Sequence, residues 1–149
     1  MSQIEFVLAH ESDIPELLQV EASASGRLYS AYSENDLREF FSAGHKFFLI
    51  KRDGLVLGSV SVEADTGQSI EFGSLVLLPE FRMRGIGVRV FRSGLHHFAS
   101  SGYTRIHALV HPDNESMLRI YFAFGFKEAR RIENAFGDGE PRLELALQL

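Results

Sequence analysis

The sequence predicts an α/β (α+β) fold, with a mostly antiparallel sheet of seven strands flanked by four helices. Short segments of alternating or continuous apolar residues, typical of strands, are interspersed with longer segments in which apolar residues recur at helical spacing. An Asp53-Gly54 pair between two apolar segments indicates an antiparallel hairpin. The expected order is strand, two helices, three strands, helix, strand, helix and two strands.

The chain is expected to begin with a strand over residues 4–9. The helix that follows opens at Ser12, which would cap its first turn, and that turn tolerates Pro15. The small and polar residues 23–32 after this helix have the composition of a mobile connection.

A second helix is expected after Ser33, which can form a capping box with Asp36, and Gly44 ends this helix. Two strands, over residues 46–52 and 55–63, then lie on either side of the hairpin turn.

The second half of the chain is expected to alternate strands with helices. A turn over residues 65–68 leads into an apolar strand that ends at Leu78, and a helix starts after Gly87 and ends at Gly102. Four apolar residues at helical spacing mark the inner face of this helix: Val88, Phe91, Leu95 and Phe98. The last elements are a strand, a helix and two strands, over residues 104–110, 114–125, 126–133 and 143–149.

Length and composition limit the functions open to the chain. We expect one domain over residues 1–149, and the content of 45% hydrophobic and 23% charged residues is ordinary for a soluble globular protein. Without cysteine there is no disulfide, cysteine nucleophile or thiolate zinc site, and no metal is expected. A formal charge of −5 argues against nucleic-acid binding. The N-terminus lacks secretion features and no apolar run is long enough for a membrane, which predicts a cytoplasmic protein.

Residues 70–91 organise the chain, because they join an apolar strand to a helix through a basic turn that contains two glycines. Gly85 and Gly87 let the backbone approach a ligand, and the helix they open offers unpaired N–H groups and the positive end of its dipole. Arg82 and Arg84 add full charges, which favours a pyrophosphate over a single carboxylate. An ordinary strand-to-helix turn with solvated arginines would show the same residues.

Known phosphate-binding loops narrow the interpretation. The dinucleotide fingerprint needs a third glycine where this chain has Val90, and no Gly-Lys-Ser/Thr follows for a P-loop. The pattern that does match is Arg82-x-x-Gly85-x-Gly87. It closely resembles the acetyl-CoA pyrophosphate loop of the GNAT superfamily of N-acyltransferases.

A second motif strengthens this resemblance. The spacing Asn114-x-x-Met117-x-x-x-Tyr121-x-x-x-Gly125-Phe126 is similar to a GNAT pattern of Asn, a small residue, Tyr, Gly and Phe. Together with the order of elements, the resemblance covers nearly the whole chain and implies a GNAT-like mixed sheet, splayed between its fourth and fifth strands. Two residues depart from the family. Met83 stands where Gly is frequent and must point away from the phosphates, and Met117 stands where Ala is usual and could narrow the cofactor groove.

The resemblance implies that acetyl-CoA binds as co-substrate. In the family, N–H groups of the glycine-containing loop hold the pyrophosphate, and a backbone N–H at the end of the preceding strand, here that of Leu77, faces the thioester carbonyl. The resemblance assigns twelve residues to the cofactor: Leu75, Val76, Leu77, Arg82, Met83, Arg84, Gly85, Ile86, Gly87, Val88, Asn114 and Tyr121.

Two residues are the catalytic candidates. The resemblance implies that Tyr121 protonates the departing thiolate, although its spacing with Met117 also fits a core aromatic. It also makes Glu71 the first candidate for the general base, directly or through water, while a solvent-facing strand residue would look the same. His111 is a second candidate base or a simple turn residue. Since there is no cysteine, the amine would attack the thioester directly in a ternary complex.

The acceptor is expected to be a primary amine: a protein N-terminus, a lysine, a polyamine or a small metabolite. In the family it docks between the connection after the first helix and the loop between the last two strands, residues 26–32 and 134–142 here. The substrate candidates are Tyr29, Tyr32, Glu71, His111 and Phe136. Three acids of this region could attract a cationic amine: Glu133, Asp138 and Glu140. A homodimer is left open.

The alternative is a non-catalytic acyl-CoA-binding or regulatory module that keeps the cofactor groove but does not turn over. The presence of Tyr121 and Glu71 favours the enzyme. Release of free thiol in the presence of amines would distinguish the two.

Overall fold

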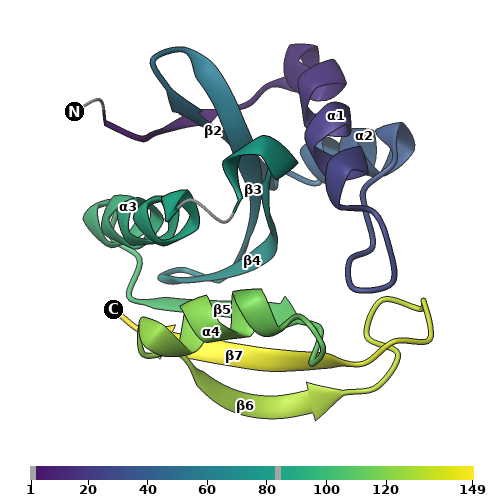
Figure 1. Ribbon diagram of the computed structural model, residues 1–149, viewed down its shortest axis with the longest axis vertical. Coiled ribbons are helices and arrows are strands. Elements are labelled where there is room, and N and C mark those ends of the chain that lie inside the picture. The colour runs from purple at the N-terminus through teal and green to yellow at the C-terminus, as the bar shows by residue number, and fades with distance from the viewer. Residues whose placement is uncertain (1–2, 83–84) are drawn as a thin grey trace.

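The computed structural model describes residues 3–82 and 85–149 and arranges them around one mixed sheet (Figure 1). In these residues the elements are β1 (Glu5–Leu8), η1 (Glu11–Asp13), α1 (Ile14–Ala24), α2 (Glu34–Ser42), β2 (Lys46–Arg52), β3 (Leu55–Thr66), β4 (Ser69–Leu77), η2 (Pro79–Phe81), α3 (Ile86–Ser100), β5 (Arg105–Val110), α4 (Glu115–Ala123), β6 (Lys127–Ile132) and β7 (Arg142–Gln148). The order of helices and strands is the one that the sequence predicts.

The seven described strands form one sheet in the order β1-β2-β3-β4-β5-β7-β6. Neighbouring strands are antiparallel except β4 and β5, which are parallel. Their pairing joins only residues 69–72 of β4 to residues 105–108 of β5, so the rest of β4 diverges from β5. This confirms the predicted mixed sheet with a splay between its fourth and fifth strands.

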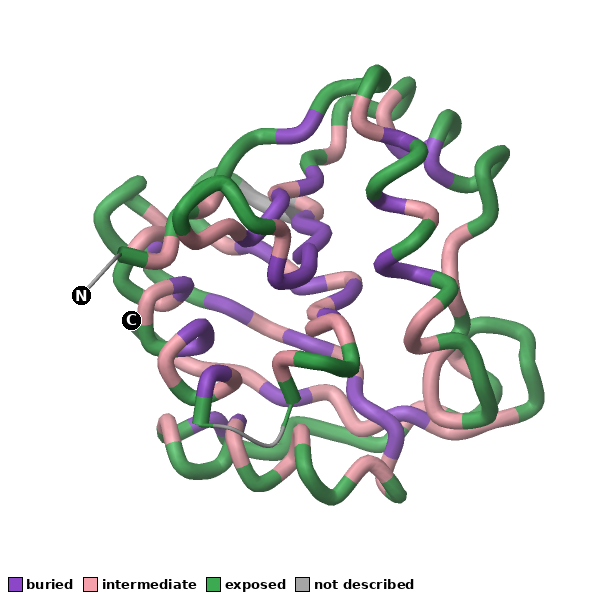
Figure 2. The backbone as a smooth tube through the Cα atoms, turned by 45° about the horizontal axis from the view of Figure 1, so that its top comes forward, coloured by how far each residue is buried: buried purple, intermediate pink, exposed green. Residues whose placement is uncertain are grey.

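Helices cover both faces of the sheet (Figure 1), and each face has its own apolar core. The larger core joins the sheet to α3 and α4 through residues such as Phe72, Phe98 and Ile106. The smaller core lies under α1 and α2, where Leu17 and Phe47 are fully buried. Figure 2 shows that buried positions concentrate on the inner strands and on the inward sides of the helices, whereas the connections are largely exposed.

Two of the predicted local signals are confirmed. Ser33 accepts a hydrogen bond from the backbone N–H of Asp36, whose carboxylate accepts one from the N–H of Ser33, as in a capping box. Asp53 and Gly54 have φ angles of 53° and 76°, the left-handed conformations that a type I′ hairpin turn requires.

Two local predictions are wrong. Ser12 does not cap α1, because residues 11–13 form a short 3-10 turn and the helix starts at Ile14. The carboxylate of Asp13 accepts the backbone N–H of His10 at 2.8 Å, which stabilises that turn. Val88 does not face the core: its side chain is 39% exposed, whereas Val90 is buried. Phe91 and Phe98 are buried as expected, so the error concerns the first turn of α3, where Ile86 and Val90 face the core in place of Val88.

Candidate active site

Two cavities adjoin where β4 parts from β5. The larger, of about 390 Å³, is lined by the end of β4, Arg82, the first turn of α3 and one side of α4. The smaller, of about 60 Å³, extends between the parted strands towards the loop before β7. The two share five lining residues: Leu28, Tyr29, Leu75, Asn114 and Met117. A ligand in the larger cavity can therefore reach a second molecule in the smaller one.

The end of β4 directs a backbone N–H into this gap. The N–H of Leu78 donates to the carbonyl of Leu57 in β3 at 2.8 Å. Successive residues of a strand direct their peptide groups to opposite edges, so those of Leu77 point away from β3, towards the gap. The carbonyl of Leu77 accepts a hydrogen bond from Nε of Arg82 at 2.8 Å. Leu77 lines the larger cavity but not the smaller one, and its N–H is directed to the gap on the β5 side of β4.

The N-terminus of α3 has the features of an anion site. Gly85 precedes the helix with φ 74°, and no described side chain caps the first turn, so its N–H groups are open to a ligand. Gly87 and Arg82 line the larger cavity. Ile86 is buried in the core, so only its backbone could serve a ligand, and Val88 points outward. Met83 and Arg84, also predicted for the cofactor, lie outside the described residues.

Tyr121 stands at the small cavity on α4. Its ring is 2% exposed and packs edge-on against Phe91 and Phe126, with centroids 4.8 Å away in both cases. Burial raises the pKa of the Tyr121 phenol above its ordinary value, which keeps the hydroxyl protonated at neutral pH. Tyr121 is therefore a core aromatic that also borders the small cavity, and its role as proton donor stays a prediction.

Asn114 and Met117 lie at the start of α4 and line both cavities. The Asn114 side chain caps the helix by accepting a hydrogen bond from the N–H of Met117 at 3.4 Å. Met117 lines both cavities, and the narrowing of the cofactor groove by its side chain stays a prediction.

A buried carboxylate anchors the connection after α1. Glu21 is fully buried and accepts hydrogen bonds from the hydroxyl of Tyr29, at 2.6 and 2.9 Å, and from the N–H of Tyr32 at 3.0 Å. Burial raises the pKa of Glu21, and these two hydrogen bonds partly oppose the shift. The connection that composition predicts to be mobile is thus tied to α1, and it places the Tyr29 ring at both cavities.

The structure separates the substrate candidates into two groups. Tyr29, His111 and Phe136 line the small cavity. Tyr32 instead packs against Phe40 and Phe47 of the smaller core, and burial raises its pKa to about 12. Glu71 pairs in register with Glu63 and His107 and lines neither cavity.

His111 is held at both ring nitrogens. It is 2% exposed; its Nε2 lies 2.9 Å from Oε1 of Glu140, and its Nδ1 accepts the N–H of Asp113 at 3.0 Å. Arg27 then bridges Glu140 and Asp113 at 2.9 and 3.1 Å. These contacts join the connection after α1 to the loop before β7, which lie side by side in Figure 1.

The acids expected to attract a cationic amine are already paired. Asp138 lies 3.0 Å from Arg142, Glu133 lies 2.6 Å from Arg131, and Glu140 contacts His111 and Arg27. A hydrogen bond from the backbone N–H of Glu140 and the contact with Arg142 lower the pKa of Asp138. Hydrogen bonds from His111 and Arg27 likewise lower the pKa of Glu140. The loop before β7 therefore presents ion pairs instead of open negative charge.

Several lining residues are missing from the predicted site. Phe91, Val90 and Ile120 line the larger cavity and Leu109 and Val110 the smaller one, and each looks like an ordinary core residue in the sequence. Arg142, which also lines the smaller cavity, stands at the end of the predicted acceptor loop without an assigned role. Its only signal is a charge at the start of a leucine-rich strand.

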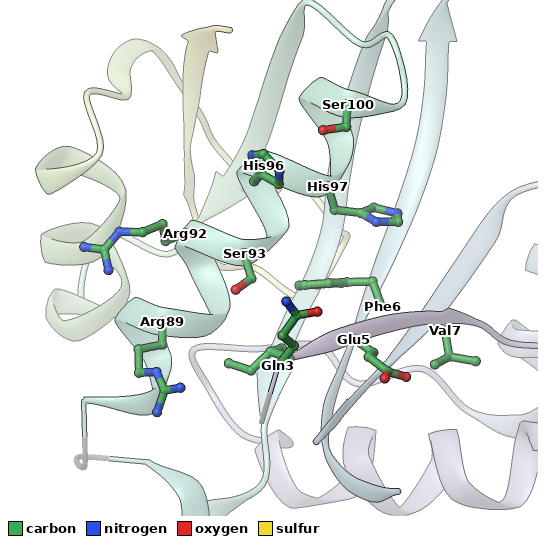
Figure 3. A pocket seen from close by; sticks show the side chains of 11 residues that line it. Gln3, Glu5, Phe6, Val7, Arg89, Arg92, Ser93, His96, His97 and Ser100 are labelled. Carbon is green, nitrogen blue, oxygen red and sulfur yellow. The ribbon is translucent and has the colours of Figure 1, made fainter. Parts of the chain in front are cut away.

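A third cavity, of about 960 Å³, lies apart from the splay, between β1 and the outer side of α3 (Figure 3). Arg89 and Arg92 line it with His96 and His97. These two arginines therefore do not line the cavities at the splay, where Arg82 lies.

Within the described ranges, no cluster of three or more His, Cys, Asp or Glu residues could hold a metal ion. None of the helices in the same residues has the length and apolar character needed to cross a bilayer.

The described residues form a splayed mixed α/β fold in which two adjoining cavities lie between the end of β4, the N-terminus of α3 and α4. Residues 13–126 match the acetyltransferase (GNAT) family, and the chain belongs to that family. It is an acetyltransferase, and its acetyl donor is acetyl-CoA.

Known proteins agree with this assignment. An N-alpha-acetyltransferase of Sulfolobus acidocaldarius is 24% identical over 95% of this chain and 90% of its own. The crystal structure of the ribosomal-protein-S18-alanine N-acetyltransferase from Escherichia coli has a TM-score of 0.82 at 16% identity, over 99% of this chain and 94% of that one. The structure of yncA from Salmonella typhimurium with its cofactor acetyl-CoA has a TM-score of 0.74 at 16% identity, over 100% and 94% of the two chains.

Proposed function

We propose that this protein transfers the acetyl group of acetyl-CoA to a primary amine by direct attack within a ternary complex. The observation that carries the proposal is the junction of the two cavities beside the end of β4. The larger cavity is the proposed site of the pantetheine arm, and the smaller one is the proposed site of the amine next to the thioester. The chain has no cysteine that could carry the acetyl group between them.

The donor is held at its diphosphate by the N–H groups of the first turn of α3, together with the guanidinium of Arg82. Gly87 supports this role because it leaves the wall of the larger cavity without a side chain. The N–H of Leu77 then donates to the thioester oxygen, on which negative charge develops during attack. A single donor of this kind contributes about 2.7 to 4 kcal/mol to catalysis.

The amine nitrogen attacks the thioester carbon, the C–S bond breaks, and the thiolate leaves with a proton from Tyr121. The phenol stays protonated at neutral pH, so its proton is available; because a thiol has a pKa of only about 8.5, the transfer is uphill and is completed as the thiol is released. The position of Tyr121 at the small cavity supports this assignment.

The amine must lose a proton before or during attack. At pH 7 that loss costs about 4.6 kcal/mol for a lysine amine and about 1 kcal/mol for an α-amine. Glu71 is the proposed base, and because it lines neither cavity it would act through water. His111 is the weaker candidate, since both of its ring nitrogens already have partners.

Of the two kinds of amine compared above, an α-amine costs less free energy to deprotonate at pH 7 than a lysine side chain does. A relative that is an N-alpha-acetyltransferase and a fold neighbour that is a ribosomal-protein-alanine N-acetyltransferase support a protein N-terminus as one acceptor class, beside free amino compounds.

The proposal is tested by incubating the protein with acetyl-CoA and a panel of amines while free thiol is followed. The panel includes peptides with free N-termini, N-blocked lysine, polyamines and amino acids. Amine-dependent thiol release is expected. Tight binding of acetyl-CoA without thiol release for any amine would instead support a non-catalytic binding module.

A further inference from the structure

Arg142 is a buried arginine at the acceptor end of the small cavity. It is the first residue of β7, its side chain is 2% exposed, and it lines the cavity together with Tyr29, His111 and Phe136. A guanidinium is always charged, and burying a charge is costly unless partners compensate it. The role of Arg142 therefore depends on whether its neighbours use all the hydrogen-bond donors of the guanidinium.

The neighbours of Arg142 fix the position of its guanidinium. Nη2 donates to Oδ2 of Asp138 at 3.0 Å, Nη1 donates to the carbonyl of Pro141 at 3.0 Å, and the ring of Phe136 lies 5.0 Å from its central carbon. A guanidinium has five N–H donors in a planar fork that suits a carboxylate. Among the described residues, the two oxygen contacts take two of these donors, which leaves others for an incoming anion.

The charged side chains around the cavity favour an anion over a cation. The described residues that line it include Arg142 and His111 but no carboxylate. Glu140 and Asp138 are paired with cations outside the cavity wall, and Glu21 is bonded to the hydroxyl of Tyr29. A second positive charge on the acceptor, as in a polyamine, would thus face the guanidinium of Arg142 and find no carboxylate in the cavity wall, since Asp138 is already paired with Arg142.

The size of the cavity limits the distance between the two groups of the acceptor. A volume of about 60 Å³ corresponds to roughly two water molecules at about 30 Å³ each, which suffices for an amine and one or two carbon atoms. An anionic group that reaches Arg142 while the amine faces the thioester must therefore be only a few bonds from that amine.

We propose that Arg142 binds a carboxylate of the acceptor, so that the preferred acceptor is an amine with a carboxylate a few bonds away. This inference rests on the proposed acetyl transfer and names its substrate class. The carboxylate belongs either to a free amino acid or to the acidic N-terminal residue of a peptide, which share this chemistry.

The first test measures kcat/KM of the wild-type protein for matched acceptors by thiol release. One arm compares free amino acids with their carboxamides, and the other compares short peptides that begin with Glu or Asp with those that begin with Gln or Asn. A preference of tenfold or more for the carboxylate is expected in at least one arm, and the arm that shows it identifies the source.

The second test uses Arg142→Gln and Arg142→Lys. Arg142→Gln is expected to remove the carboxylate preference by raising KM for the acid tenfold or more, with KM for the amide unchanged, and Arg142→Lys to retain part of the preference. Arg130→Gln is the matched control, because Arg130 is an exposed arginine of β6 that pairs with Glu144. It is expected to keep the full preference. If Arg142→Gln fails to fold, the comparison of acid and amide acceptors with the wild-type protein still tests the carboxylate preference.

Equal rates for acids and amides in both arms, or a preference that survives in Arg142→Gln, would overturn the role of Arg142 while acetyl transfer stands. An equal loss of activity towards acids and amides in Arg142→Gln would show a purely structural arginine. Thiol release from no amine at all contradicts the proposed function itself, and with it this inference.

Discussion

The donor side and the acceptor side of the site are built in different ways. The proposed donor side lies at the end of β4, the N-terminus of α3 and the first turn of α4, and its main contacts with the coenzyme are expected from backbone N–H groups. The acceptor side uses side chains from three connections that are distant in sequence, joined by Arg27, Glu140 and His111. A coenzyme common to a whole family can be bound by main-chain groups that are indifferent to side-chain changes. An acceptor that differs between members is recognised by side chains on loops, which can change without disturbing the sheet.

The largest expected effect is on the donor side. Gly87→Asp should abolish detectable acetyl-CoA binding in calorimetry, because it places a carboxylate beside the diphosphate. The protein should remain folded, since an acidic residue in the first turn of a helix is favourable. Gly87→Asn, of the same shape without the charge, should bind at least tenfold more tightly than Gly87→Asp. Equal affinities of the two variants for acetyl-CoA would contradict a diphosphate site at the N-terminus of α3.

Tyr121→Phe tests the junction between the two sides. It should lower kcat by about 10² to 10⁴ with little change in the Kd of acetyl-CoA, because the ring packing is kept and only the acidic hydroxyl is lost. Calorimetry and thiol release measure the two quantities separately. If kcat is unchanged, Tyr121 serves as a core aromatic alone.

Glu71→Gln should flatten the low-pH limb of the kcat/KM profile, because the proposed base can no longer lose its proton. Acetyl-CoA binding should not change, since Glu71 does not line the larger cavity. A profile that keeps its low-pH limb in the variant would exclude Glu71 from the mechanism.

The smallest effect is expected at Glu21, which anchors the acceptor side. Burial raises the pKa of Glu21, so the folded protein binds this proton more tightly than the unfolded chain does. The associated stability is full below the unfolded pKa of about 4.3 and is lost as the pH rises through the folded pKa. Each tenfold difference in proton affinity between the folded and unfolded protein corresponds to about 1.4 kcal/mol.

Glu21→Gln keeps an oxygen for Tyr29 and Tyr32 but does not titrate. Between pH 4 and pH 7, Tm of the wild type should therefore fall relative to that of Glu21→Gln. A difference in Tm that stays constant over this range would contradict a buried, titrating carboxylate.

The same contrast explains what the sequence could predict. The turn at Gly85 and the capping box of Ser33 depend on neighbours within a few residues, and both are found as expected. Periodicity alone did not decide which valine of the first turns of α3 faces the core, because Val88 and Val90 both lie within one turn of Phe91; the structure buries Val90 and exposes Val88.

The acceptor side depended on tertiary pairing. The pairing of Glu140 with Arg27 joins residues 113 positions apart, which no local pattern indicates. Alternation in β7 places Arg142 opposite the leucine face, where a polar residue is usually solvated. It is buried, and Phe136 and Asp138 lie against its guanidinium. The sequence therefore indicated which loops form the acceptor side, but it did not indicate which of their charged residues are paired or buried.

The most direct test of the account is a crystal structure of the protein with acetyl-CoA. We expect the diphosphate within hydrogen-bond distance of the N–H groups of Gly87 and Val88, and the thioester oxygen near the N–H of Leu77 in the gap between β4 and β5. A coenzyme seated elsewhere, such as between β1 and the outer side of α3, would contradict it.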